Sequence, residues 1–152
     1  MMTTMNKSRS LYPLIAFVCV IYILYVLVYN YMVDPGAEAF LSRKTGLEHE
    51  LKPRIWLKVM YIHVAFACLA MVTGLMNFSA RSYGKHRTFH RVNGYVYVFA
   101  VLLVVLTSGY MAPYATGGKI GSMGFNLLNL LWLAITTTAI VHIRGKRTIQ
   151  HR

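Results

Sequence analysis

The run LYPLIAFVCVIYILYVLVYNYMV at residues 11–33 contains no charged side chain, and it decides the fold class of this chain. A helix of about 20 apolar residues crosses the roughly 30 Å hydrocarbon core of a bilayer. Three further apolar stretches follow, and we expect membrane helices at 55–79, 92–112 and 120–143. The sequence therefore predicts an all-α integral membrane protein with four transmembrane helices in an up-down bundle. A single transmembrane domain would occupy residues 1–152.

The composition agrees with a membrane protein. Apolar residues make up 57% of the chain and charged residues 13%, against about 25% charged residues in a soluble domain. A net charge of +12 would otherwise indicate a nucleic-acid partner. The basic residues lie between and beyond the apolar stretches, so we expect the lipid bilayer as partner and no nucleic acid. The 11–33 run is too long for a signal-peptide core, and no small-x-small cleavage site follows it, so we interpret it as a retained helix.

The distribution of charge predicts an orientation. All four acidic residues fall in the 34–54 loop, together with four Lys or Arg residues. The shorter 81–91 loop and the 144–152 tail each hold four Lys or Arg and no acid. Cytoplasmic segments of membrane proteins carry an excess of Lys and Arg. We therefore expect a multi-pass protein of the inner, cytoplasmic membrane with both termini in the cytoplasm and the 34–54 loop outside.

Breaker residues mark the connections. Asp34-Pro35-Gly36 is a strong helix stop after the first span. The segment at 37–51 has the pattern of a short surface helix, with Phe40, Leu41 and Leu47 touching the membrane. Proline and glycine residues at 113–118 predict the turn between the third and fourth spans. Cys19 and Cys68 lie within apolar spans without C-x-x-C spacing, so no disulfide framework is indicated.

His63 is the one residue well inside a span that apolar packing does not explain, because it lies about 12 Å deep by helical rise. One face of its helix consists of His63, Ala67, Ala70, Gly74 and Asn77. Small residues allow another helix to approach closely, so this face should point into the bundle. The opposite side, expected to face lipid or to pack loosely, carries Leu57, Val64, Met71 and Leu75.

Depth suggests hydrogen-bond partners for His63. Polar residues at its level are Tyr22 and Tyr25 in the first span and Asn126 and Asn129 in the fourth. A neutral imidazole bonded to one of these groups would need no cofactor. A ligand-binding or proton-relay role of His63 is the alternative. On the fourth helix one face is formed by Asn129, Trp132 and Thr136.

The remaining histidines suggest a cofactor site at the cytoplasmic side. His86 and His90 are four residues apart, a spacing that chelates a metal ion on a helix. His90 and His142 lie at one membrane level and are candidate axial ligands of a haem b, with His63 as a further cofactor-binding candidate. The bases around His90 suit haem propionates, although they equally anchor helix ends at anionic lipid. No nucleophile–base–acid set is visible, which favours a non-enzymatic protein.

The run His90-Arg91-Val92-Asn93-Gly94-Tyr95-Val96-Tyr97 has the form H-R-x-x-G-x-x-Y. Together with Tyr61-Ile62-His63 and the glycine-rich turn, it resembles a family of bacterial multi-pass membrane proteins of unknown function, over about residues 50–152. The resemblance implies a membrane location and no particular reaction. His151-Arg152 is similar to a pair that leads into further hydrophobic sequence in that family.

Three hypotheses of function remain. The first is a non-enzymatic membrane protein of unassigned role whose polar interior residues are mainly structural. The second is a small haem- or metal-binding redox protein that uses the cytoplasmic histidines. The third is a transporter subunit, which with four spans would act as a homo-oligomer.

Overall fold

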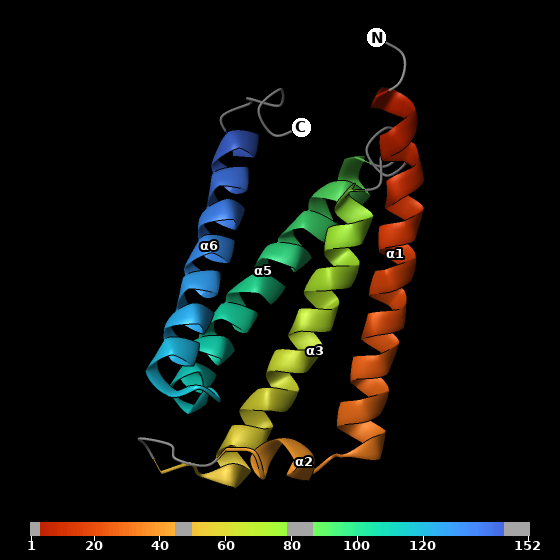
Figure 1. Cartoon of the computed structure of the whole chain (residues 1–152). Coiled ribbons are helices and arrows are strands. Elements are labelled where there is room, and N and C mark those ends of the chain that lie inside the picture. Colours follow the sequence, from red (N-terminus) through yellow and green to blue (C-terminus); the bar gives the residue numbers. More distant parts are fainter. Residues whose placement is uncertain (1–3, 45–49, 79–86, 145–152) are drawn as a thin grey trace.

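The computed structural model describes residues 4–44, 50–78 and 87–144, and in these ranges every regular element is helical. Four long helices alternate in direction, and two short helices lie at the end of the molecule away from the termini (Figure 1). In chain order the elements are α1 (Thr4–Val28), a π-helical continuation η1 (Tyr29–Val33), α2 (Glu38–Leu41), α3 (Pro53–Phe78), α5 (Arg87–Met111), the 3-10 turn η2 (Ala112–Tyr114) and α6 (Gly118–Arg144).

The long helices are long and apolar enough to cross a membrane, which confirms the predicted all-α class and the four spans. The structural bounds of the spans are Leu11–Val33, Pro53–Phe78, Thr88–Tyr114 and Gly118–Val141. The predicted bounds differ most in the third span, where the helix begins earlier than residue 92. Its first turn is polar, and hydropathy alone does not mark such a turn as helical.

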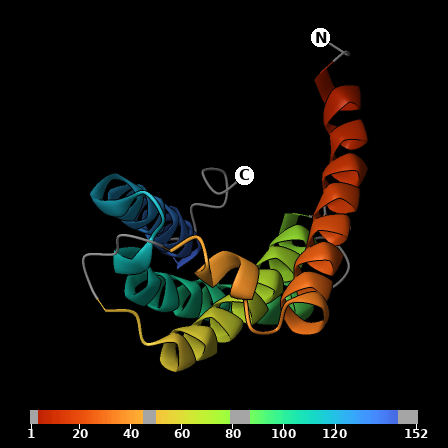
Figure 2. The ribbon, with the colours of Figure 1, turned by 60° about the horizontal axis from the view of Figure 1, so that its bottom comes forward.

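The packing is centred on α3 and α5, which run side by side with α1 and α6 on their outer flanks (Figures 1 and 2). Ala70, Ala100 and Val101 form the tightest part of this contact, and all three are almost completely buried. A Cβ atom placed on Gly74 would already lie 3.4 Å from the Tyr97 ring. Small residues therefore set the distance between these helices, as the sequence predicted for this face of α3.

Helix α1 is attached to α3 by two tyrosine hydroxyls. Tyr12 donates to the carbonyl of Leu75 at 2.9 Å, and Tyr31 donates to the carbonyl of Tyr61 at 2.9 Å. One expectation for α3 changes: Leu57 and Val64, on the side expected to face lipid or to pack loosely, are partly buried against the cluster of Ala37, Trp56 and Met60. The exposed face of α3 is rotated from it and carries Ile55, Ile62, Leu69, Val72 and Met76.

The connection after α1 follows the predicted stop. The π-helical turn ends at Val33, where the Asp34 amide bonds to the Tyr29 carbonyl at 2.9 Å. The Asp34 carboxylate then accepts the amides of Glu38 at 2.9 Å and Ala39 at 3.1 Å. These are the unpaired donors of a helix start. Asp34 thus ends one helix and caps α2, the short surface helix expected in this segment.

The turn into α6 depends on glycine. Gly117 and Gly118 have φ angles of 105° and 61°, in the region that side chains disfavour. One turn later, a Cβ atom on Gly121 would lie 2.8 Å from the carbonyl oxygen of Thr116. Glycine at these positions lets α6 fold back tightly against η2.

Candidate functional site

His63 bonds across the α3–α5 interface. Its Nδ1 lies 2.9 Å from Oγ1 of Thr107. The Thr107 hydroxyl is also 2.7 Å from the Leu103 carbonyl, to which it donates in its own helix. Because that hydroxyl has one proton, its oxygen accepts from the imidazole, and neutral His63 therefore carries its proton on Nδ1. The Nε2 atom then keeps a free lone pair.

This bond corrects the partners expected from depth. The amide of Asn129 donates instead to Ser108 Oγ at 2.9 Å, and both residues are buried. The interior position of His63 is confirmed, since the imidazole is half-buried against α5. The rotation of α5 about its axis decides which polar group meets the imidazole. The depth of a residue in the membrane, which the sequence does predict, carries no information on that rotation.

A second polar contact lies at the other end of the α3–α5 pair. The side-chain amide of Asn93 donates to the Thr73 carbonyl and to Asn77 Oδ1, both at 2.8 Å. Asn77 thus belongs to the interior face of α3 predicted from the sequence. His63, Ala70, Gly74 and Asn77 all meet α5, at successively lower residue numbers of that antiparallel helix.

Helix α6 uses its polar face in the same way. Besides the Asn129–Ser108 bond, the Trp132 indole donates to the Tyr97 hydroxyl at 3.1 Å. Thr136 shares this face and is buried, but its hydroxyl has no hydrogen-bond partner among the described residues. The face formed by Asn129, Trp132 and Thr136 therefore points into the protein, as predicted.

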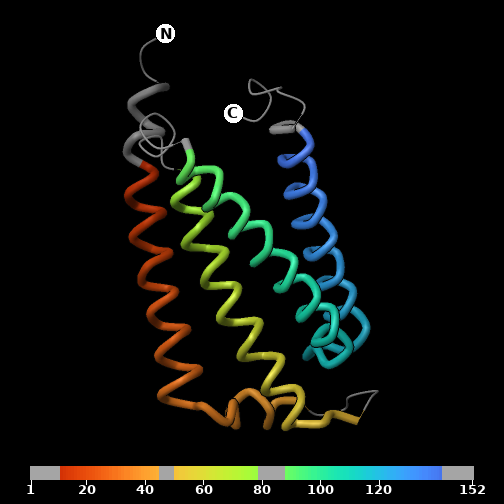
Figure 3. Tube along the Cα trace, turned by 180° about the vertical axis from the view of Figure 1, so that it is seen from behind, coloured from red at the N-terminus to blue at the C-terminus, as the bar shows by residue number. Residues whose placement is uncertain are grey.

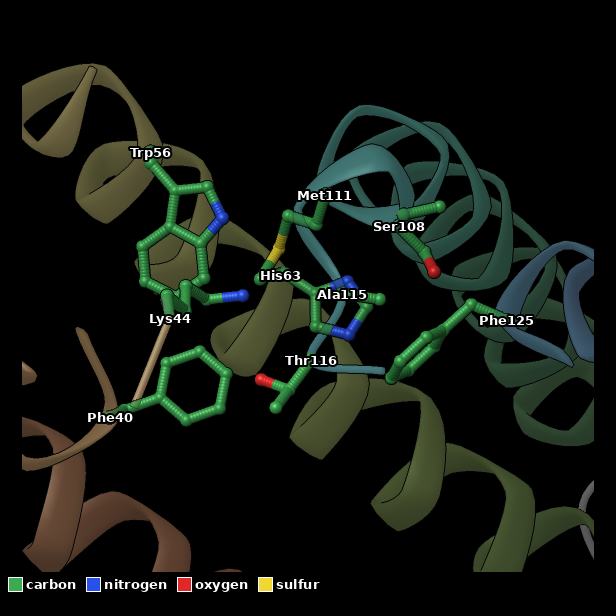
Figure 4. Close-up of a pocket in the computed structure, with 10 residues that line it drawn as sticks. Phe40, Lys44, Trp56, His63, Ser108, Met111, Ala115, Thr116 and Phe125 are labelled. Atoms are coloured by element: carbon green, nitrogen blue, oxygen red, sulfur yellow. The ribbon is translucent and has the colours of Figure 1, made fainter. Parts of the chain in front are cut away.

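A cavity of about 240 Å³ lies at the end of the molecule that carries α2 and η2; we call it the loop-end cavity. It is bounded by the segment after α2, by α3, by the end of α5 with η2, and by the start of α6 (Figure 4). Its lining residues are Phe40, Lys44, Trp56, His63, Ser108, Met111, Ala112, Ala115, Thr116 and Phe125. His63 is thus shared by the interhelical contact and the cavity wall.

Two nitrogen donors stand near His63 in this cavity. Figure 4 shows the Trp56 indole nitrogen and the Lys44 amine on the sides of their side chains that face His63. Trp56 is 1% exposed, and its Nε1 has no hydrogen-bond partner among the described residues. The Lys44 amine lies 4.6 Å from the Phe40 ring centroid and 5.1 Å from that of Trp56, and it donates to the Tyr114 carbonyl. Partial burial lowers the pKa of Lys44, because the charged amine loses water.

The structure describes only part of the histidine group that the sequence predicts at the cytoplasmic side. His90 lies in the first turn of α5 and is half-buried. His142 lies in the last turns of α6, where side chains are not described, and His86 falls outside the described residues. Helices α5 and α6 meet near η2 and separate toward the ends that carry His90 and His142 (Figures 1 and 3). Within the described part of the chain, no three His, Cys, Asp or Glu residues are grouped to hold a metal ion.

Sequence reasoning missed three residues of this site. Thr107 has the sequence setting of an ordinary membrane threonine that bonds to a preceding carbonyl, and it makes that bond as well as the one to His63. Trp56 reads as an interfacial aromatic residue, and its complete burial comes from the 34–44 segment folding over it. Lys44 is one of four bases in the loop, and nothing in its sequence neighbours distinguishes it.

The fold and the buried polar contacts define a polytopic α-helical membrane protein. A family model described as "predicted membrane protein (DUF2306)" matches residues 60–152, and the chain belongs to this family. The match confirms the resemblance seen in the sequence, and it covers α3 from Met60 onward together with α5 and α6. No curated protein and no solved structure matches the chain.

Proposed function

We propose that this chain is a non-enzymatic component of a bacterial cytoplasmic membrane, with both termini in the cytoplasm, whose polar interior residues hold the helices together. The observation that carries this proposal is the pairing of interior polar groups. His63 with Thr107, Asn93 with Asn77, Asn129 with Ser108 and Trp132 with Tyr97 all bond between different helices.

The free energies expected of these hydrogen bonds are those of helix-packing interactions. Lipid tails are as apolar as leucine side chains, so helices in a bilayer associate through close packing and interhelical hydrogen bonds. Each such bond contributes on the order of 0.6 kcal/mol. Leaving one partner buried and unpaired costs more, roughly 1–3 kcal/mol. A helix pair with polar groups matched along its length is therefore fixed in register without any cofactor.

The same contacts make a transport path through one copy of the chain the weaker hypothesis. A path would require polar faces that line a common space. Here the polar faces of α3 and α6 both pack against α5. Thr107 and Asn93 of α5 bond to α3, and Ser108 and Tyr97 of α5 bond to α6.

Absorption and metal analysis of the purified protein test the proposal against the redox hypothesis. The protein is extracted in detergent from cells grown with added haem precursor and iron. We expect no Soret band and no stoichiometric metal. A Soret band that disappears in His90→Ala and His142→Ala, and persists in the control His49→Ala, would replace the structural proposal by haem binding. His49 lies in the loop between the first two spans, away from the predicted cytoplasmic side.

A further inference from the structure

The loop-end cavity has the chemistry of a binding site, and two of its donors, Lys44 and Trp56, take no part in the bonds between the long helices. We propose that it binds the oxyanion group of an amphipathic molecule from the bilayer, with the Lys44 amine and the Trp56 indole N–H as donors. The inference is independent of the structural role proposed for the interhelical contacts.

The first argument is the unpaired donor. Trp56 is buried to 1% exposure, and its Nε1 lacks a hydrogen-bond partner in the described structure. A buried donor without a partner costs roughly 1–3 kcal/mol, and the great majority of buried polar groups are paired. An acceptor atom within the cavity would remove this cost, and an oxyanion is the strongest acceptor available.

The second argument is charge. Lys44 places an ammonium group at the cavity wall, and it uses one of its three N–H bonds for the Tyr114 carbonyl. None of the ten lining residues is acidic. Ser108 adds a hydroxyl whose oxygen already accepts from Asn129, so that its own proton is available for donation. A negative group in the cavity would therefore meet donors and one positive charge without a competing carboxylate.

The third argument is that the other residues of the cavity wall are mostly apolar. Phe40, Met111 and Phe125 are among the apolar lining residues and suit methylene groups. A volume of about 240 Å³ is below the 300–1,000 Å³ usual for sites that enclose a whole ligand. It fits an oxyanion and the first methylenes of a chain whose remainder stays in the bilayer. The carboxylate of a fatty acid and the phosphate of an anionic phospholipid share this chemistry.

Equilibrium binding to the purified full chain in a non-ionic detergent tests the proposal. The probes are tritiated laurate and tritiated dihexanoyl-phosphatidylglycerol, measured by scintillation proximity. Methyl laurate and dihexanoyl-phosphatidylcholine serve as competitors that lack a net negative charge. Lys44→Met removes the proposed cation, and Lys58→Met is the matched control, since Lys58 is an exposed base of α3 that does not line the cavity.

We expect saturable binding of at least one anionic probe, weakened about tenfold by Lys44→Met, which is the loss of one charge-assisted contact. Trp56→Phe should weaken binding as well, because it keeps a ring and removes the N–H donor. Lys58→Met should bind as the wild type does, and Lys44→Arg should retain most of the affinity. If only laurate binds, the bound oxyanion is a fatty-acid carboxylate. If only the phosphatidylglycerol probe binds, it is a lipid phosphate.

The proposal is overturned if neither probe binds saturably, or if methyl laurate competes as well as laurate does. Equal binding by wild type and Lys44→Met would also overturn it. The melting temperature of each variant, measured without probe, separates loss of binding from loss of folding. A variant that fails to fold is replaced by Lys44→Gln or Trp56→Tyr, which keep the polarity or the aromatic ring at these positions.

Discussion

Nδ1 of His63 on α3 lies 2.9 Å from Oγ1 of Thr107 on α5, and this bond joins the two most closely packed helices about midway between the loop end and the Ala70 contact. The Thr107 hydroxyl donates to the Leu103 carbonyl of its own helix. The imidazole is therefore fixed in one tautomer and held against α5, and the same residue lines the loop-end cavity. Packing and cavity geometry depend on the same side chain.

Removing the imidazole should destabilise the protein. We expect His63→Ala to lower the free energy of unfolding by roughly 1–3 kcal/mol, because it creates a void and removes the hydrogen bond. His63→Asn, which keeps a donor, should recover part of this loss. Thr107→Val should cost less, and a double-mutant cycle should give a coupling energy of about 0.5–1.5 kcal/mol. Reversible unfolding in mixed micelles measures the four proteins of the cycle and His63→Asn.

Thr137→Val is the control for the threonine. Thr137 makes the same kind of bonds within its own helix, to the carbonyls of Leu133 and Ala134, but it is exposed and meets no other helix. We expect little effect of this substitution. A coupling energy of zero between His63 and Thr107 in the double-mutant cycle would contradict the structural role proposed for His63.

The Asn93 contact makes a second prediction. Asn93→Ala would remove the side-chain donor to Asn77 Oδ1 and the second donor to the Thr73 carbonyl, which keeps its backbone bond within α3. We expect a loss of about 1–3 kcal/mol, because the Asn77 oxygen loses its partner in the helix interface. Asn126→Ala on α6 is the matched control, since Asn126 is exposed. Thermal unfolding followed by circular dichroism compares the two, and equal melting temperatures would show that the Asn93 bonds are not energetically significant.

Two glycines of α6 should respond differently to the same change. In Gly121→Ala the new methyl group would lie 2.8 Å from the Thr116 carbonyl oxygen, so the turn has to shift. In Gly124→Ala the methyl group meets nothing within 4 Å. We expect Gly121→Ala to cost roughly 1–3 kcal/mol and Gly124→Ala to be neutral or stabilising by up to about 1 kcal/mol. Equal melting temperatures of the two variants would show that α6 does not fold back this tightly.

The sequence predicted the helices well because length and hydropathy within each span are local properties. It also predicted which face of α3 points inward, since Ala70, Gly74 and Asn77 repeat at helical spacing with His63. It did not predict the partner of His63, because two helices at the same depth can be rotated freely about their axes. It did not predict the cavity either, since Lys44 and Trp56 reach it through the fold of a loop and not through any periodic pattern.

Orientation is the last property to test, and single cysteines measure it directly. With Cys19→Ala and Cys68→Ala as background, Ser42→Cys lies just after α2 in an exposed position. Ser82→Cys lies in the basic 81–91 loop, outside the described residues. Since Lys and Arg are retained on the cytoplasmic side, a membrane-impermeant maleimide applied to intact spheroplasts should label Ser42→Cys and spare Ser82→Cys. Permeabilised spheroplasts should label both. Labelling of Ser82→Cys from outside would show the opposite orientation, and the loop-end cavity would then lie at the cytoplasmic side of the membrane.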